Sequence, residues 1–216
     1  MTTVEKLDHL WTYYKFVLLI VVILVMLVSM VVTGITNANR ETLLSGAVIN
    51  VNLDQAGRNY INRDYFEKLQ GVKGDQEIAV NNFNFEDPST AVNFEMTSNS
   101  IMRLIAMVEG KMLDYALTDM VGLNVSLGNQ LFMDLRKVMT EEELAKWEGK
   151  VITMKYGDDG EEFPVAINIT DTAYVKNHVR SDESCYFAVL DNTTRLDAVK
   201  AFWNYLITYE PKQPAA

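Results

Sequence analysis

The sequence predicts an α/β protein in which an N-terminal transmembrane helix precedes one mixed α/β domain. Two observations support this prediction. Residues 16–39 contain no charged side chain, although 22% of the whole chain is charged. After residue 40, stretches of strand character alternate with stretches of helical spacing as far as residue 208. Such alternation is typical of an α/β fold, and the length suits one domain with its own core.

The apolar run at residues 16–36 is expected to anchor the chain in the lipid bilayer. A helix needs about 20 apolar residues to cross a membrane, and a core helix of a soluble protein would show a polar stripe. The aromatic residues Trp11, Tyr13 and Tyr14 stand at one end, as in an interfacial belt. A cleaved signal peptide is the alternative, but its apolar core spans only about 7–15 residues before a small-residue cleavage site.

The orientation of this anchor follows from the basic residues around it. Lys6 and Lys15 precede the apolar run, and the first basic residue after it is Arg40. The positive-inside rule therefore favours a cytoplasmic N-terminus at the cell membrane. The expected parts are a cytoplasmic tail, a transmembrane helix, a tether, an extracytoplasmic α/β domain and a disordered tail (1–15, 16–36, 37–45, 46–208 and 209–216).

The net negative charge lies entirely in the part of the chain after the anchor. The formal net charge is −10, and the charged side chains of residues 1–15 cancel. An acidic domain without a basic patch excludes nucleic acid as a partner. The single cysteine, Cys185, forms no internal disulfide, which fits a bacterial cell surface better than a eukaryotic secretory route. Its apolar surroundings indicate a buried, inert thiol.

The first half of the domain has three stretches of strand character and two of helical spacing. Residues 46–53, 77–85 and 92–96 favour strands. Ile61, Tyr65 and Leu69 mark a helix between the first two strands. A second, amphipathic helix follows residue 96, capped by Ser98 or Ser100; its apolar stripe is Ile101, Leu104, Ile105, Val108 and Met112.

The second half begins with a short buried strand at residues 114–119, followed by a segment that is irregular or a short helix. Thr140 and Glu143 form a capping box at the start of a helix. Residues 150–169 favour a hairpin with its turn at residues 158–160. A buried strand at 184–191 then leads to an amphipathic helix; its apolar face carries Leu196, Val199, Phe202, Trp203 and Leu206.

The sequence carries no recognisable catalytic or metal-binding motif. It lacks a phosphate-binding loop, a nucleophile elbow and paired metal-ligand spacings. His9 lies before the anchor, on the other side of the membrane. His178 lies in a polar stretch and is expected at the surface, and no spacing supports a catalytic triad around it. We therefore expect no enzyme activity, no metal and no cofactor.

One corner of the domain is a candidate ligand site. In open α/β sheets, ligands bind beyond the carboxyl ends of strands, where helix N-termini supply free N–H groups. The candidate ligand-binding residues there are Ser98, Ser100, Asp119, Asn168 and Asp171. The alternative interpretation is that these residues are ordinary helix caps and turns.

Residues 100–208 resemble a known family. The segments "AMVEGKMLDYALTD" and "LFMDLRKVMTEEELAKW" are similar to a stretch of the extracellular solute-binding proteins of ABC transporters, which have the type II periplasmic-binding fold. Gly110, Asp114 and "MDL" (133–135) hold the places of that family's helix end, Asp-bearing strand and helix-introducing segment. "GEEFPVAINIT" is similar to its hinge-proximal strand, and "SCYFAVLDNTTRLDAVKAFWNYLI" to its late strand and helix.

This resemblance implies a single lobe of that fold in an extracytoplasmic setting. The family usually has two lobes, and its aromatic ligand platforms have no matching position here. The chain also looks like small single-pass proteins of Firmicutes with a "YYK" flank and an anchor.

Three functions remain open. The first is a non-enzymatic accessory, sensing or interaction component of a membrane complex, with a membrane protein or transporter as partner. The second is a small-ligand (solute) binding module for an ABC transporter. The third is a surface hydrolase that would depend on His178.

Overall fold

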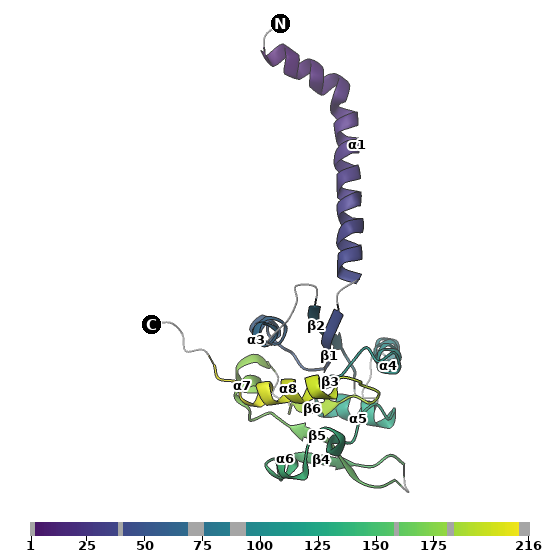
Figure 1. Cartoon of the computed structure of the whole chain (residues 1–216). Helices are drawn as coiled ribbons and strands as arrows, with labels where there is room; N and C mark the ends of the chain where they lie inside the picture. The colour runs from purple at the N-terminus through teal and green to yellow at the C-terminus, as the bar shows by residue number, and fades with distance from the viewer. Residues whose placement is uncertain are drawn as a thin grey trace. The chain divides into compact units, whose positions relative to one another are not determined.

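The computed structural model describes residues 3–38, 41–68, 76–86, 94–157, 160–180 and 184–211. The chain divides into two compact units, Met1–Glu41 and Thr42–Ala216. Figure 1 shows the first unit as helix α1 (Thr3–Ala38) and the second as a mixed α/β domain. The predicted fold class is therefore confirmed at the level of one apolar N-terminal helix and one α/β domain.

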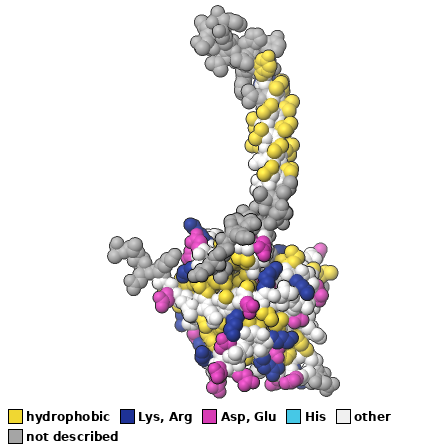
Figure 2. Space-filling view, in the orientation of Figure 1, with side chains coloured by type: hydrophobic (Ala, Val, Ile, Leu, Met, Phe, Trp, Pro, Cys, Tyr) yellow, Lys and Arg dark blue, Asp and Glu magenta, His cyan; other side chains and the backbone are white. Residues whose placement is uncertain are grey.

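Helix α1 has an apolar stretch at Tyr14–Gly34. This stretch has 21 residues and a mean hydropathy of 3.3, and it is the one described helix that is long and apolar enough to cross a membrane. Figure 2 shows apolar side chains covering the described part of this stretch. A signal sequence shares these properties. The structure therefore establishes an apolar helix that is long enough to cross a bilayer.

In the described part of the domain, six strands form one sheet in the order β2-β1-β3-β6-β5-β4. β1 and β3 are parallel, whereas β6 is antiparallel to both β3 and β5, and β4 is antiparallel to β5. The strands are β1 (Glu41–Ile49), β2 (Gln76–Phe83), β3 (Tyr115–Thr118), β4 (Val151–Met154), β5 (Phe163–Asn168) and β6 (Tyr186–Val189).

Helices cover both faces of this sheet. Successive strand residues point to opposite sides and so enter two different cores. One core joins the strands to the segment α2 (Gln55–Asn59), η1 (Tyr60–Tyr65) and α3 (Phe66–Lys68), and to α7 (Ala173–His178) and α8 (Leu196–Ile207). The other core joins them to α4 (Phe94–Glu109) and α5 (Met120–Gly128). The short elements η2 (Leu135–Lys137) and α6 (Glu141–Ala145) precede β4.

A buried carboxylate fixes the start of α8 to the sheet. Asp114 has no exposed side-chain surface. It accepts hydrogen bonds from the Ser45 backbone N–H at 2.8 Å and the Thr193 hydroxyl at 2.6 Å, and it pairs with Arg195 at 2.8 Å. These contacts tie β1, the entry to β3 and the loop before α8 together. Helix α8, which carries site residues at its other end, is thereby held in place.

Several predicted elements are confirmed. The capping box of Thr140 and Glu143 opens α6, and β4 and β5 form the predicted antiparallel hairpin. The residues of its predicted turn at 158 and 159 lie outside the described residues. The segment after β3 is a helix, α5, because Asp119 caps it by accepting the Gly122 N–H.

Two predictions about the first half are wrong. Residues 41–45 were expected in a tether but form the first half of β1, and Ser45 is buried within it. Of residues 92–96, expected in a strand, 92 and 93 lie outside the described residues and 94–96 open α4. The cause is helical spacing that extends upstream, since the buried Thr97 continues the stripe of Leu104 and Val108. Ser98 and Ser100 therefore lie inside α4 and do not cap it.

The segment around His178 also differs from expectation. It was interpreted as a polar loop, but Thr172 caps helix α7 by accepting the Val175 N–H. Tyr174 and Val175, on the inner face of this helix, are buried. Six residues are too few to reveal a helical period among polar neighbours. The predicted tail at 209–216 is wrong at its start, where Tyr209 contacts aromatic residues of the domain; residues 212–216 lie outside the described residues.

Candidate functional site

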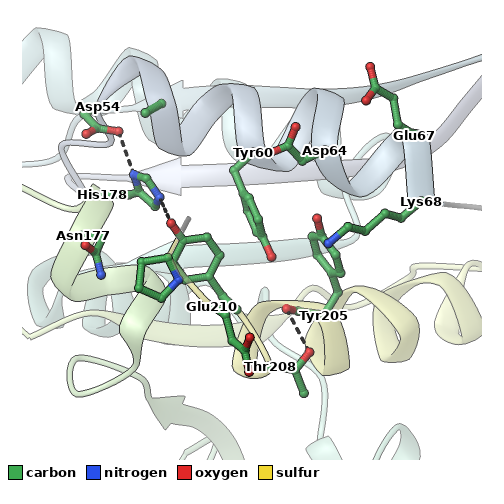
Figure 3. A pocket seen from close by; sticks show the side chains of 13 residues that line it. Asp54, Tyr60, Asp64, Glu67, Lys68, Asn177, His178, Tyr205, Thr208 and Glu210 are labelled. Carbon is green, nitrogen blue, oxygen red and sulfur yellow. Dashed lines mark hydrogen bonds and ion pairs between the residues drawn. The ribbon is translucent and has the colours of Figure 1, made fainter. Parts of the chain in front are cut away.

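A groove of about 1070 Å³ lies between the helical segment at residues 54–68, the end of α7 and the end of α8. We call it the tyrosine groove. Among the residues that the structure describes, its walls carry three tyrosines, one histidine and several charged side chains (Figure 3). The side chains that matter for its chemistry are Tyr60, Tyr205, Tyr209, His178, Asp54 and Lys68.

Three polar side chains form a hydrogen-bonded relay along one wall. His178 Nδ1 lies 3.2 Å from an oxygen of Asp54, and its Nε2 lies 2.7 Å from the hydroxyl oxygen of Tyr209. A neutral imidazole satisfies both contacts if Nδ1–H donates to Asp54 and Nε2 accepts the Tyr209 O–H. The His178 side chain is only 12% exposed. The prediction of a surface histidine is therefore wrong.

The chain around Asp54 explains why His178 fits there. Asp54 caps α2 by accepting the Gly57 N–H at 2.6 Å, and its own N–H donates to the His178 carbonyl at 2.9 Å. A Cβ atom on Gly57 would lie only 2.7 Å from Cβ of His178. Glycine thus allows α2 and the end of α7 to approach closely. The Tyr174 hydroxyl strengthens this contact by donating to the Gly57 carbonyl at 3.1 Å.

The tyrosine rings form the floor of the groove. Tyr60 stacks with Tyr205 at a centroid distance of 4.9 Å and meets Tyr209 edge to face at 4.5 Å. Burial raises the pKa of Tyr60 well above its usual range, and electrostatic interaction with the neighbouring Tyr205 raises this pKa further. The phenol of Tyr60 therefore stays neutral at physiological pH. Figure 3 shows its ring between the relay and Tyr205.

Charged side chains also line the groove. The Lys68 ammonium lies over the Tyr205 ring, 4.9 Å from its centroid. Asp64, Glu67 and Glu210 also line the groove, and Glu67 pairs with the exposed Arg63 at 3.0 Å. Aromatic faces beside charged groups offer contacts to a ligand that carries both an apolar part and a charge.

The residues of the predicted ligand corner have ordinary structural partners. Asp119 is buried, caps α5 and accepts from the side-chain amide of Asn50 at 3.1 and 3.2 Å. Asn168 accepts the Thr170 N–H in a turn. Asp171 is exposed and pairs with Lys150 at 3.2 Å.

The sheet does bring part of that corner together. Thr118 and Asn168 are both in register with Tyr186 of β6, so the ends of β3 and β5 lie at one edge. Ser98 and Ser100 lie in the second turn of α4. The five candidate residues thus divide among a helix, a cap and two turns, and ligand binding by them stays a prediction.

Sequence reasoning missed the tyrosine groove because its parts lie far apart in the chain. Asp54 and His178 are 124 residues apart. The one local signal was Asp54 followed by a helix and Gly57, which marks a cap but says nothing of a histidine. Among the described residues, no group of three or more His, Cys, Asp or Glu side chains could hold a metal ion.

Comparisons with known proteins identify no relative of this chain. The chain matches no family model, no curated protein and no solved structure with which it was compared. The groove and the apolar helix are therefore the features that bear on function.

Proposed function

We propose that this chain is a non-enzymatic binding domain anchored in the cell membrane by residues 16–36. The apolar stretch of α1 supports the anchor, and the aromatic residues before it suit the membrane interface. In the proposed topology the N-terminus is cytoplasmic and the α/β domain lies outside. The domain then serves as a sensing or accessory component of a membrane complex, for example one associated with a transporter.

The observation that carries the binding role is the tyrosine groove. Its volume of about 1070 Å³ is close to the upper end of the range for small-molecule sites, roughly 300–1,000 Å³. Its aromatic floor and its polar wall come from three helical segments held by hydrogen bonds and a close glycine contact. A ligand would therefore meet a largely preformed surface, which reduces the ordering cost of binding.

The test of this proposal uses the full chain in lipid nanodiscs. Thermal unfolding is followed with small cations, small anions and neutral sugars at high concentration. A ligand present at about 100 times its dissociation constant adds roughly 2.7 kcal/mol to folded-state stability, so a binding domain should show a raised midpoint with at least one class. The same ligand should leave the midpoint of Tyr205→Leu unchanged. If no class raises the midpoint of the wild-type chain, the binding role is wrong.

The proposed topology has its own test. External protease is added to intact cells that express the chain with a tag at its C-terminus. Loss of the tag is expected, since the α/β domain should be accessible from outside. A protected tag in intact cells that is lost after permeabilisation would place the domain in the cytoplasm and overturn the orientation.

A second candidate function is a surface hydrolase, favoured by one observation. Asp54, His178 and Tyr209 stand in the order carboxylate, imidazole and hydroxyl, an arrangement that can activate a hydroxyl as a nucleophile. Nitrophenyl esters and phosphates distinguish the two functions. The binding role predicts turnover at the background rate. Turnover that disappears in both His178→Gln and Tyr209→Phe would establish the hydrolase instead.

A further inference from the structure

The position of Lys68 indicates what kind of ligand the tyrosine groove accepts. Its ammonium lies 4.9 Å from the centroid of the Tyr205 ring. A cation over an aromatic face is attracted by the ring's quadrupole, by about 0.5–1 kcal/mol at an exposed site. Lys68 itself is exposed and lies at the end of the described helical segment. The chain's own ammonium group therefore occupies the aromatic face weakly, on a long and flexible side chain.

We propose that the tyrosine groove binds a small organic cation, an alkylammonium ion, which replaces the Lys68 ammonium over Tyr205. This inference deepens the proposed binding function and depends on it. The incoming cation takes the same ring face, while the Lys68 side chain turns toward solvent. Lys68 thus acts as an intramolecular competitor of the ligand.

The stacking of the rings supports a site for a cation at this place. Tyr205 is held by Tyr60 at 4.9 Å and by Tyr65 at 4.8 Å, so its ring is fixed before a ligand arrives. Burial raises the pKa of Tyr65 to about 12 and that of Tyr60 further. Neutral phenols keep their hydroxyl protons and offer dipoles to a ligand without adding charge. A rigid aromatic surface of this kind is what ammonium ions recognise in proteins.

The charges around the rings favour a cation over an anion. Among the described residues, Asp64, Glu67 and Glu210 line the groove, with Glu67 paired to Arg63, whereas Lys68 is the one described lysine that lines it. An anion would have to bind at Lys68 while it faces these carboxylates. A cation would be attracted by the carboxylates. It would be repelled only by Lys68, whose side chain can move away.

The test compares choline with acetate in binding to the full chain in nanodiscs made only of phosphatidylglycerol. Salt is matched, and the dissociation constant is measured by calorimetry for wild type and variants. Lys68→Gln should bind choline about 2- to 5-fold more tightly, since the competing cation–π contact is lost. Tyr205→Phe should keep the affinity, and Tyr205→Leu should weaken it about 5-fold or more. Lys137→Gln removes the same charge outside the groove and should leave the affinity unchanged.

The variants separate the inference from the function on which it rests. If wild type binds choline but Lys68→Gln binds it equally or more weakly, Lys68 is no competitor and the inference is wrong. If acetate binds and Lys68→Gln abolishes that binding, the groove takes anions, and only the ligand class is overturned. If neither probe binds, the inference fails, and the wider ligand panel decides the binding function.

A second arm asks where the ammonium group comes from. Wild type in phosphatidylcholine nanodiscs is titrated with the same free choline. Weaker apparent binding than in phosphatidylglycerol discs that persists at about 1 M salt, where the surface charge of the discs is screened, would show that lipid headgroups compete for the groove. Equal binding in both discs would identify a free solute as the source. Circular dichroism of each variant shows that a lost signal does not come from unfolding.

Discussion

Replacing Gly57 with alanine should destabilise the domain and disrupt the relay in the tyrosine groove. The added Cβ would lie 2.7 Å from Cβ of His178 and 2.7 Å from Cδ2 of Leu53. Ordinary carbon–carbon contacts are about 3.5–4.0 Å, so two neighbours must move by roughly 1 Å. Cβ of His178 is the root of its side chain and moves only with the backbone, whereas Cδ2 is the end of the Leu53 side chain, which is buried and has little room to move.

The expected change in the free energy of unfolding combines two destabilising effects and one stabilising effect. Overpacking of this kind costs about 1–3 kcal/mol. Loss of one of the two relay hydrogen bonds when His178 shifts costs about 1 kcal/mol more. Alanine in place of a helical glycine gains up to about 1 kcal/mol. We therefore expect Gly57→Ala to lower the free energy of unfolding by about 1–3 kcal/mol.

Urea unfolding of the full chain, followed by tryptophan fluorescence, measures this loss. Gly128→Ala is the matched control, since Gly128 also lies in a helix but a Cβ there would meet no atom within 4 Å. The control should be as stable as wild type or slightly more stable. If Gly57→Ala matches Gly128→Ala in stability, the close approach of α2 to His178 is not what the structure indicates.

Two further predictions concern buried groups. Asp114→Asn should lower the free energy of unfolding by about 3 kcal/mol, because it breaks a buried ion pair. Asp171→Asn should change stability far less, because its side chain is 68% exposed and solvent screens its ion pair. Equal losses in denaturant titrations would contradict the burial of Asp114. Burial raises the pKa of the Cys185 thiol from 9.0 to about 12. A thiol reagent at about pH 8 should therefore modify Cys185 only after unfolding.

The raised pKa of Cys185 also predicts a pH dependence of stability. The unfolded chain ionises its thiol near pH 9, and the folded chain near pH 12. Protonation therefore favours the folded state, with a contribution fully present below about pH 9 and lost as the pH rises toward 12. Between pH 8 and 10.5, wild type should lose about 2 kcal/mol more than Cys185→Ala. Parallel losses in the two proteins would show that the thiol does not titrate as inferred.

The parts of the fold that the sequence predicted are those set by local patterns. The uncharged run of α1 and the apolar stripe of α8 repeat over enough residues to be recognised without tertiary contacts. The capping box of Thr140 and Glu143 needs only two residues at a fixed spacing. The hairpin of β4 and β5 follows from alternation and a turn between them.

The parts that were missed depend on contacts between distant segments. Helix α7 has six residues, and its burial comes from Tyr174, whose hydroxyl reaches Gly57 in another segment. His178 stands among polar neighbours in sequence and gains its partners, Asp54 and Tyr209, only when α2 and the end of α8 converge. Without homologous sequences, no local pattern links these positions. Asp119 follows strand β3 as its sequence position indicates, and its hydrogen bonds serve a helix cap.

The most direct test of the central claim follows the tyrosine resonances of the full chain in nanodiscs. The chain is labelled with fluorotyrosine, each resonance is assigned by single substitutions, and a small cation, a small anion and a neutral sugar are added in turn. Binding in the groove predicts that the cation shifts the resonances of Tyr60, Tyr205 and Tyr209, while the core residue Tyr115 stays unchanged. If none of the three probes shifts the groove resonances, the tyrosine groove is not a ligand site and the account is contradicted.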